Sequence, residues 1–310
     1  MRIISDYQFV ETSDRGATAA IGNFDGVHLG HRSVIEMARA AVPDVPLGIV
    51  TFEPHPRAYF APDAPPFRLM SSAARASRLA KVGVEKLYQL PFNAAIASLT
   101  PLEFAEKILH HGLGLRHVVV GADFCFGKGR AGTAADLVAF GANLGFGVTI
   151  APLMAQSEQT VSSTAIRRAL SEARPRDAAA MLGHWHRIEA PVIGGEQRGR
   201  ELGYPTANMS IDGLHPPAFG VYAVLVDVLE GAHKGSYHGV ASMGVRPMFG
   251  ENKPNLETFI FDFKGDLYGT PLSVGLVDHL RGEEKFDSLE ALITQMDADS
   301  ARARAILTAL

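Results

Sequence analysis

The chain has 310 residues, of which 47% are hydrophobic and 20% are charged, and its formal net charge is −4. This length allows two domains of ordinary size, and the composition is that of a globular protein rather than a disordered one. The small negative charge gives no sign of a protein that binds nucleic acid or an acidic membrane. Anionic ligands would therefore be held by local charge, main-chain N–H groups or a metal ion.

Cys125 is the only cysteine, which excludes an intrachain disulfide and favours a reducing compartment. The first residues lack the long apolar core of a signal peptide. No apolar run approaches the ~20 residues that are needed to span a bilayer. We therefore expect a cytoplasmic protein without a membrane segment.

Up to Gly183, short runs rich in Val and Ile alternate with helical patterns, as in the stretch where Val34, Ile35, Ala38 and Ala41 share one face. This alternation is typical of βαβ units and predicts a parallel sheet covered by helices on both faces. The expected strands are Ala17–Ile21, Leu47–Phe52, Lys86–Leu90, His117–Gly121 and Gly147–Ile150.

After Gly183 the runs read as strands with no long helix between them, and Gly and Pro separate them. This pattern predicts a small antiparallel barrel or sandwich. The expected strands are Ile188–Ile193, Val221–Val226, Tyr237–Met243, Glu257–Asp262 and Leu272–Val277. A closing helix is predicted by the capping-box spacing of Asp287 and Glu290 and by the apolar stripe that follows. We expect domains at residues 1–183 and 184–310.

The stretch Ile21–His31 (IGNFDGVHLGH) runs from the end of the first expected strand into a helix. Ligands of parallel α/β sheets bind at the carboxyl ends of strands, and a helix N-terminus there offers N–H groups to a phosphate. Gly22 and Gly30 let the main chain approach such a ligand. His28 and His31 share a helical face and could donate hydrogen bonds to charge developing on phosphate oxygens. The alternative is a glycine-rich turn with two surface histidines.

Val161–Arg167 (VSSTAIR) also precedes a helical run. Ser163, Thr164 and the preceding Ser162 are good N-cap residues, and their hydroxyls can also bond phosphate. Arg167 would lie near the first turn, where its guanidinium can hold a phosphate through two hydrogen bonds. Taken alone, the motif fits plain helix capping with a solvated Arg167 better than phosphate binding.

The loop Gly121–Arg130 (GADFCFGKGR) follows another expected strand. It is not a P-loop, because five residues rather than four separate Gly121 from Gly127, and Gly129 stands where Ser or Thr is needed. The loop is compatible with part of an ATP or flavin pocket, and also with a simple βα turn.

These motifs, with TFEPHP (51–56), resemble the adenylyltransferase half of the bifunctional riboflavin kinase/FAD synthetases of prokaryotic type. HxGH together with SSTxIR is typical of the wider nucleotidylyltransferase group. The forms GNFDGVH and GADFxFG narrow the resemblance to the flavin branch of that group. The resemblance implies a Rossmann-like domain in which His28 and His31 stabilise the ATP phosphates. It further implies ATP binding by Gly22, Asn23, Gly30, Ser163, Thr164 and Arg167, and flavin binding by Asp123 and Phe124. Cys125 stands where many relatives have Arg; if that Arg contacts substrate in them, Lys128 or Arg130 would have to replace it here.

The second half contains Gly199–Asn208 (GRELGYPTAN), in which Pro205 and the glycines predict a tight turn. Thr206 and Asn208 would point to one side of an extended segment and could supply two oxygens to an Mg²⁺ ion that nucleotide phosphates and water also hold. Glu257, at the start of an expected strand, could accept a proton from an attacking hydroxyl. The alternatives are ordinary turn chemistry and a solvated charge.

GRELGYPTAN, GVYAV (220–224), GVASMGVRPMFG (239–250), LETFIFDFKGDLYG (256–269) and LRGEEKF (280–286) resemble the riboflavin kinase module of the same family, in order and spacing. The resemblance implies a β-barrel with a C-terminal helix, Mg-nucleotide binding by Thr206 and Asn208, and Glu257 as the base. It also implies nucleotide contacts from Gly199 and Arg200. The flavin pocket would be lined by Arg281, Glu284 and Phe286.

The resemblance covers almost the whole chain and implies two reactions: phosphorylation of riboflavin to FMN by ATP, and adenylylation of FMN to FAD with release of pyrophosphate. The expected ligands are riboflavin, FMN, ATP and Mg²⁺, without nucleic acid or membrane. Two alternatives stay open, an enzyme that retains one activity and a non-catalytic flavin sensor. Oligomeric state and protein partners cannot be read from the sequence.

Overall fold

The computed structural model describes residues 1–152, 155–156, 159–194, 203–248 and 251–310. These residues form two compact units, the first made of residues 1–64 and 75–161 and the second of residues 65–74 and 162–310. Within the described ranges, no helix combines the length and the apolar character that crossing a membrane would require.

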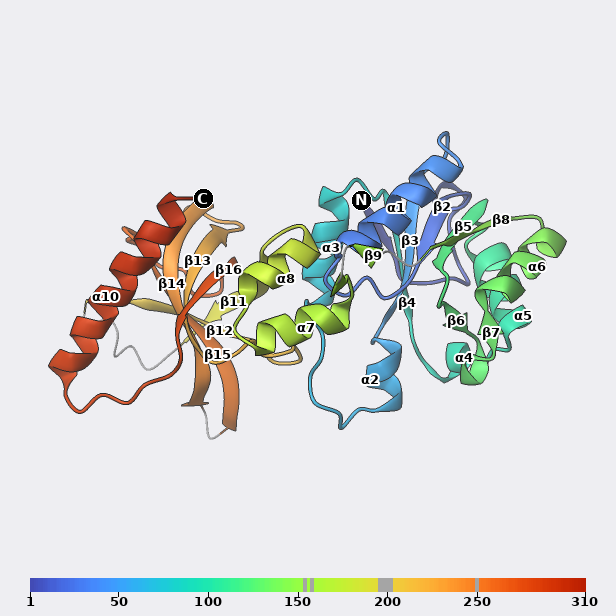
Figure 1. The fold of residues 1–310 in the computed structure, drawn as a ribbon. Coiled ribbons are helices and arrows are strands. Elements are labelled where there is room, and N and C mark those ends of the chain that lie inside the picture. The colour runs from blue at the N-terminus through green and yellow to red at the C-terminus, as the bar shows by residue number, and fades with distance from the viewer. Residues whose placement is uncertain (153–154, 157–158, 195–202, 249–250) are drawn as a thin grey trace. The chain divides into compact units, whose positions relative to one another are not determined.

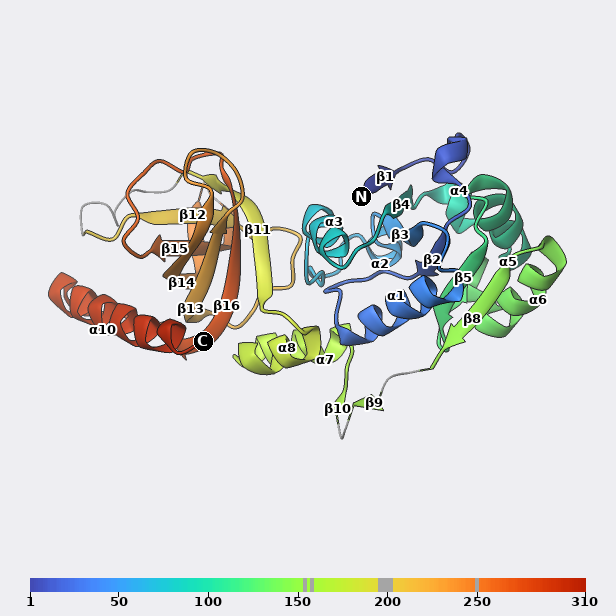
Figure 2. The ribbon, with the colours of Figure 1, turned by 90° about the horizontal axis from the view of Figure 1, so that it is seen from above.

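The first unit is built on a six-stranded sheet in the order β1–β4–β3–β2–β5–β8, in which every pair of neighbours is parallel (Figures 1 and 2). Its strands are β1 (Arg2–Ile4), β2 (Thr18–Ile21), β3 (Leu47–Glu53), β4 (Lys86–Pro91), β5 (His117–Gly121) and β8 (Gly147–Ala151). The strands expected in this half are therefore confirmed to within one residue at each end, and β1 adds a strand that was not expected.

Helices cover both faces of this sheet (Figure 2). Thr18 on β2 donates from its hydroxyl to the main-chain oxygen of Ala38, 2.8 Å away on α1. Its neighbour Ala19 points the other way and packs in a core with Phe104 and Ile108. The helical segments are η1 (Thr12–Asp14), α1 (Leu29–Ala41), α2 (Pro56–Phe60), α3 (Ser72–Lys81), α4 (Ala94–Ala97), α5 (Pro101–Glu103), η2 (Phe104–Gly112), η3 (Lys128–Arg130) and α6 (Ala134–Leu144); the short strands are β6 (Cys125–Phe126), β7 (Gly132–Thr133), β9 (Ala155–Gln156) and β10 (Gln159–Thr160).

The order of strands reverses beside β2. From β2 the chain continues through β3 and β4 on one side, and then crosses to β5 and β8 on the other. In open parallel sheets this switch point leaves a crevice at the carboxyl ends of the strands, which is where ligands bind. The segments that leave β2 at Gly22 and β5 at Ala122 therefore occupy the expected ligand position.

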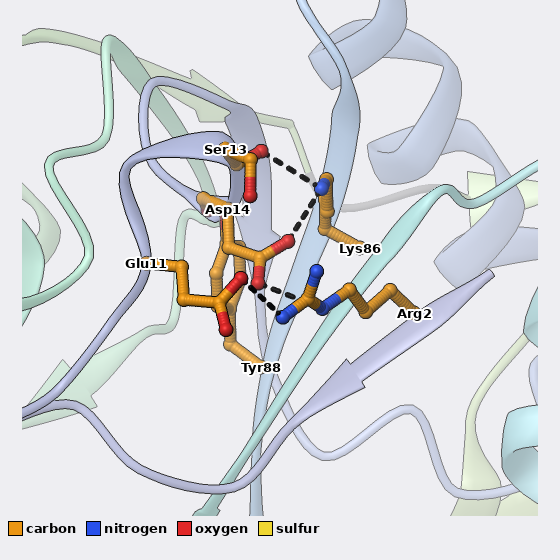
Figure 3. A network of polar contacts seen from close by, with 6 residues as sticks. All are labelled: Arg2, Glu11, Ser13, Asp14, Lys86 and Tyr88. Atoms are coloured by element: carbon orange, nitrogen blue, oxygen red, sulfur yellow. Dashed lines mark hydrogen bonds and ion pairs between the residues drawn. The ribbon is translucent and has the colours of Figure 1, made fainter.

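The short edge strand β1 is held by a buried carboxylate (Figure 3). The Asp14 side chain accepts from Arg2 on β1, at 2.8 Å, and from Lys86 on β4, at 2.6 Å. Tyr88 donates its hydroxyl hydrogen to the main-chain oxygen of Asp14 at 2.5 Å. Burial, and next the charge of Asp14, raise the pKa of Tyr88, so this hydroxyl stays a donor. The network is structural and lies at the amino ends of β1 and β4.

The second unit contains a closed antiparallel barrel in the order β11–β12–β15–β14–β13–β16. Its strands are β11 (His186–Ile193), β12 (Thr206–Ser210), β13 (Gly220–Val228), β14 (Gly235–Met248), β15 (Glu251–Ile260) and β16 (Pro271–Arg281). The predicted strands are present, several of them longer than expected, and β12 is an additional strand formed by the Thr206–Asn208 motif. The unit also includes α7 (Ser163–Ser171), α8 (Pro175–Leu182) and α10 (Leu289–Thr308).

The helix α10 closes one side of the barrel (Figure 1), where Ala303 and Leu307 pack against Ala223 and Val277. Its N-cap is Ser288, whose hydroxyl accepts from the N–H of Ala291 at 3.1 Å. The predicted capping box of Asp287 and Glu290 is therefore wrong by one residue, and the position that a box would need holds Ala291 instead.

Candidate active sites

The loop between β2 and α1 places His28 at the start of the helix. His28 is the N-cap of α1, and its Nδ1 accepts from the main-chain N–H of His31 at 3.2 Å. In a neutral ring that accepts through Nδ1, the remaining hydrogen lies on Nε2. His28 can therefore donate one hydrogen bond through Nε2 at the carboxyl edge of the sheet.

The two histidine rings stack, with centroids 3.6 Å apart and planes 15° from parallel. Burial lowers the pKa of His28 to about 4. Burial, and next the neighbouring His28, lower the pKa of His31 well below its usual value. Both rings are thus neutral at pH 7. The Nδ1 atom of His31 is buried and has no hydrogen-bond partner among the described residues. Gly30 permits this arrangement, since a Cβ there would lie 3.2 Å from the His28 ring.

The backbone of this loop is unusual for the residues it contains. Phe24 and Val27 are both fully buried and adopt positive φ angles of 50° and 44°. Such angles cost of order 1–3 kcal/mol for bulky side chains and persist only where the surroundings enforce them. The main-chain N–H of Gly22 donates to the main-chain oxygen of Val50 at 3.1 Å, which extends the pairing of β2 with β3. The side chain of Asn23 is exposed.

The loop after β5 carries the second predicted element of this site. Asp123 is exposed, while Phe124 is half-buried and stacks on Phe126 with centroids 5.5 Å apart. The thiol of Cys125 contacts the main-chain oxygen of Asp123 at 3.6 Å. Because β2 and β5 are neighbours, the structure brings this loop and the His28 loop to adjacent strand ends.

A group of aromatic side chains at the same edge had no role in the sequence analysis. Phe92, just after β4, lies 5.3 Å from Tyr59 and 5.7 Å from Phe60 between ring centroids, and 5.6 Å from Phe52 on β3. Phe60 is 68% exposed. The group offers apolar ring surface beside the carboxyl ends of β3 and β4.

The VSSTAIR motif forms the first turn of α7 in the second unit. Ser162 is the N-cap and accepts from the N–H of Ala165 at 3.2 Å, so Ser163 and Thr164 are helical residues rather than caps. Arg167 donates to the main-chain oxygen of Phe67 at 3.2 Å and to the Thr164 hydroxyl at 3.4 Å. The hydroxyls and the guanidinium thus gather at one helix N-terminus.

The PTAN motif (Pro205–Asn208) and Glu257 lie on two neighbouring strands of the barrel. Asn208 on β12 lies directly opposite Glu257 on β15, and Thr206 lies opposite Phe259. Opposed residues of an antiparallel pair point to the same face, so Thr206, Asn208 and Glu257 share one face, while Met209 points into the barrel core. Glu257 lies inside β15 and not at a strand end as expected, because the polar residues before it also pair with β14.

The residues predicted to line a flavin pocket cluster around Arg281 at the end of β16. The Arg281 guanidinium lies 5.5 Å from the Phe286 ring centroid and 3.8 Å from the Glu284 carboxylate. It also binds Asp299, a buried residue of α10 that the sequence analysis did not single out. Two other predicted residues, Gly199 and Arg200, lie outside the described residues.

Tyr204, just before PTAN, was also missed. Its hydroxyl donates to the Asp297 carboxylate on α10, and its ring centroid lies 4.9 Å from that of Phe259. Burial and then Asp297 raise the pKa of Tyr204 to about 12. The segment that leads into the PTAN strand is thereby attached to the C-terminal helix.

The donor set near Glu257 fits a divalent cation only together with a phosphate ligand. In the described parts of the chain, no group of three or more His, Cys, Asp or Glu side chains could hold a metal ion. Thr206 and Asn208 offer neutral oxygens, and the Asn208 amide oxygen also accepts weakly from Asn255 at 3.4 Å. Hard cations that bind mainly through nucleotide phosphates and water need only one or two such protein ligands.

Comparison with known proteins finds a family match for each half of the chain. Residues 10–165 match the FAD synthetase family and residues 182–307 match the riboflavin kinase family. The chain is 41% identical over 309 residues to the bifunctional riboflavin kinase/FMN adenylyltransferase of Pseudomonas fluorescens, covering 99% of this chain and 98% of that one. It is 35% identical over 296 residues to the protein of the same name from Escherichia coli (strain K12), covering 95% and 94%.

A crystal structure described as a macrolide-efflux protein from Streptococcus pneumoniae has a TM-score of 0.84 and 32% identity, and it covers 98% of each chain. The fold is therefore shared along the whole length. With the two family matches and the near-complete alignment to both bifunctional enzymes, the chain belongs to the bifunctional riboflavin kinase/FMN adenylyltransferase family.

Proposed function

We propose that this chain makes flavin cofactors, phosphorylating riboflavin to FMN and then adenylylating FMN to FAD with ATP. The observation that carries the proposal is that the parallel sheet and the barrel each hold a cluster of the predicted residues. His28 and His31 lie at the switch point of the parallel sheet, whereas Asn208 and Glu257 face each other on the barrel. The two relatives described above carry both activities in their names. Riboflavin, FMN and ATP are the ligands that follow.

In the kinase reaction, Glu257 takes the proton of the riboflavin 5′-hydroxyl as that oxygen attacks the γ-phosphorus of ATP and ADP leaves. This role is supported by the position of Glu257, which lies directly opposite Asn208 on the neighbouring strand. Phosphoryl transfer depends mainly on positioning and on charge stabilisation. Arg281, Glu284 and Phe286 are proposed to line the flavin side, and Gly199 and Arg200 to contact the nucleotide.

Both reactions of the family use ATP and a divalent metal, and we assign Mg²⁺ as that metal. It would neutralise phosphate charge in both sites. On the barrel, Thr206 and Asn208 would contribute oxygens to it and so fix the nucleotide against the strand pair. This assignment rests on the donor chemistry of the two side chains.

In the adenylylation, a phosphate oxygen of FMN attacks the α-phosphorus of ATP and pyrophosphate leaves. FMN is already an anion, so no protein nucleophile is needed. The neutral His28 and His31 donate hydrogen bonds to phosphate oxygens as charge develops, beside Gly22, Asn23 and Gly30. Ser163, Thr164 and Arg167 are proposed to hold the ATP phosphates.

The flavin ring in this reaction is assigned to the carboxyl edge of the sheet. Asp123 and Phe124 follow β5, and the exposed ring of Phe60 lies beyond β3. Planar aromatic surface suits stacking on an isoalloxazine. We further propose that the activities divide near Gly183, with residues 1–183 adenylylating and residues 184–310 phosphorylating. The single cysteine favours the cytoplasm as the site of action.

The proposal is tested by incubating the full chain with riboflavin and Mg-ATP and separating the flavins by chromatography. Successive formation of FMN and FAD is expected. FMN alone would mean that only the kinase is active, and unchanged riboflavin would favour a flavin sensor. A second incubation with FMN and Mg-ATP isolates the adenylylation.

A further inference from the structure

Arg75 on α3 is a fully buried arginine of the first unit, with 1% of its surface exposed. A buried guanidinium is costly unless ion pairs and hydrogen bonds compensate for the lost water. An apolar residue would fill the same helix position at less cost, since Leu79 on the same helix is also fully buried. The presence of a charge here therefore calls for a role beyond packing.

The guanidinium of Arg75 contacts residues at three neighbouring strand ends. Its Nη2 lies 3.1 Å from the carboxylate of Glu53, at the end of β3, and 3.3 Å from the amide oxygen of Gln89 near the end of β4. Its Nη1 donates to the main-chain oxygen of Asn23, just beyond β2, at 3.2 Å. Since β4, β3 and β2 are adjacent in the sheet, one guanidinium spans the ligand-binding edge.

The contact with Asn23 bears on the geometry of the histidines. Asn23 opens the loop in which Phe24 and Val27 hold positive φ angles, and this loop ends at His28. A loop with such backbone angles is held in place only by its surroundings. Arg75 fixes the carbonyl at its start, and the Thr51 hydroxyl adds a weaker contact to the same oxygen at 3.5 Å.

We propose that Arg75 is a positioning residue for adenylyl transfer, holding the loop from Asn23 to His28 in its working geometry while Glu53 balances its charge. This inference rests on the proposed function of the first unit. Arg75 acts through the Asn23 carbonyl and need not touch either substrate. Its planar fork suits this role, because a lysine ammonium cannot reach three acceptors on different strands with the same geometry.

The test is a graded series in the full chain. Gln89→Leu removes one acceptor and keeps the guanidinium, Arg75→Lys keeps the charge and loses the fork, and Arg75→Met removes both. We expect kcat for FAD formation from FMN to fall in that order and to reach about 10²-fold in Arg75→Met, the scale for a catalytic group displaced by an ångström. The KM values for FMN and ATP should change less than kcat, because the histidines act in the transition state.

FMN formation from riboflavin in the same samples should keep its wild-type kcat, since Glu257 and Asn208 belong to the other unit. Arg39→Met is the matched control. Arg39 also pairs with one carboxylate, Glu36, and one main-chain oxygen, that of Val82, but on the exposed end of α1. It should leave both reactions unchanged. If Arg75→Met does not fold, Arg75→Lys and Gln89→Leu carry the test.

The outcomes separate the inference from the proposed function. Wild-type protein that makes no FAD from FMN and Mg-ATP contradicts the function itself. Wild-type activity together with full kcat in Arg75→Lys and Gln89→Leu, even at a lowered melting temperature, would reduce Arg75 to a structural brace and overturn the inference.

Discussion

Arg281 and Asp299 form a two-nitrogen ion pair that joins the last strand of the barrel to the C-terminal helix. The Nε and Nη2 atoms of Arg281 lie 3.0 Å and 2.9 Å from the same carboxylate oxygen of Asp299. Gln295, one helical turn earlier, donates to the other oxygen at 2.9 Å. Since Asp299 is buried, the pair sets the direction in which the chain leaves β16 toward Glu284 and Phe286.

Asp299→Asn should therefore impair the kinase and spare the adenylylation. Removing one partner of a buried pair typically costs roughly 3–5 kcal/mol, and the freed Arg281 would no longer hold the following segment. We expect kcat for FMN formation to fall roughly 10- to 10²-fold, with a lower melting temperature for the second unit. FAD formation from added FMN should stay at the wild-type level.

Asp262→Asn provides the control. Asp262 also makes a two-nitrogen pair with an arginine of α10, Arg304, at 2.8 Å and 3.0 Å, but its side chain is 78% exposed. Exposed pairs contribute about 0–1 kcal/mol, so this variant should behave like wild type. Equal loss of kinase activity in both variants would mean that any tie to α10 matters, and not the Arg281 pair in particular.

His28→Ala removes one of the two imidazoles at the start of α1. Losing one preorganised donor to transition-state charge lowers rates by about 10²-fold or more, so FAD formation from FMN should fall by at least that factor. FMN formation from riboflavin should change little. A similar loss of both activities would indicate that His28 supports folding instead.

The stability of the first unit should fall in mild acid. The folded-state pKa of His28, about 4, is below its ordinary value of 6.5, so the unfolded chain binds a proton that the folded chain does not. The stabilisation is complete above pH 6.5 and is lost as the pH falls toward 4. A difference of this size corresponds to about 3 kcal/mol, and the low pKa of His31 acts in the same direction.

Calorimetric melting between pH 7 and pH 5 measures this effect. His28→Asn is the matched variant, because Asn is a good N-cap and does not titrate in this range. We expect a flatter dependence of the melting temperature on pH in His28→Asn. An unchanged slope would assign the pH dependence to other groups.

Glu257→Gln keeps the shape of the side chain and removes its ability to accept a proton. General-base catalysis contributes ~10²–10⁴-fold, and the loose transition state of phosphoryl transfer favours the low end of that range. The kinase kcat should fall accordingly, while Mg-ATP affinity and FAD formation from FMN should be retained. A variant with full kcat and weakened Mg-ATP binding would make Glu257 a metal ligand.

Two fragments test the proposed division of activities. Residues 184–310 contain PTAN and Glu257, and residues 162–310 add α7 and α8. Leu182 of α8 is fully buried, and Arg176 pairs with Asp278 of β16 at 2.9 Å. Burying a leucine alone contributes roughly 1.5–3 kcal/mol. Both fragments should make FMN, and the longer one should melt at the higher temperature. A folded, flavin-binding fragment without activity would contradict independent sites.

The sequence predicted most elements whose pattern is local. The Val- and Ile-rich strands and the turn at His28 were predicted correctly because the residue pattern of each lies within one short continuous segment. The segment Thr206–Ser210 was expected to be extended but not to form a strand of the barrel, because it is short and follows a turn at Pro205. Glu257 was assigned to a strand end because polar residues precede it. In each case pairing with a neighbouring strand overrode the local pattern.

Residues that act through distant partners left no such pattern. Arg75 contacts Asn23, Glu53 and Gln89 only because three strands lie side by side in the folded chain. The role of Asp299 can be recognised only from its contact with Arg281. Helix α3 also contains Arg78, and the sequence alone does not distinguish the buried arginine from its neighbour.

The closed barrel constrains the order in which a newly made chain can fold. The strand β16 pairs with both β11 and β13, joining Ile188 to Val274, so the barrel cannot close until almost the entire chain has been synthesised. Residues 65–74 belong to the same unit, in which Arg68 contacts Leu214. They are synthesised early and can join the unit only after Leu214 has been made. By contrast, all strands of the parallel sheet, and the unit that contains it, lie before residue 162. On the ribosome, the parallel sheet that carries His28 can thus be folded before the barrel that carries Glu257.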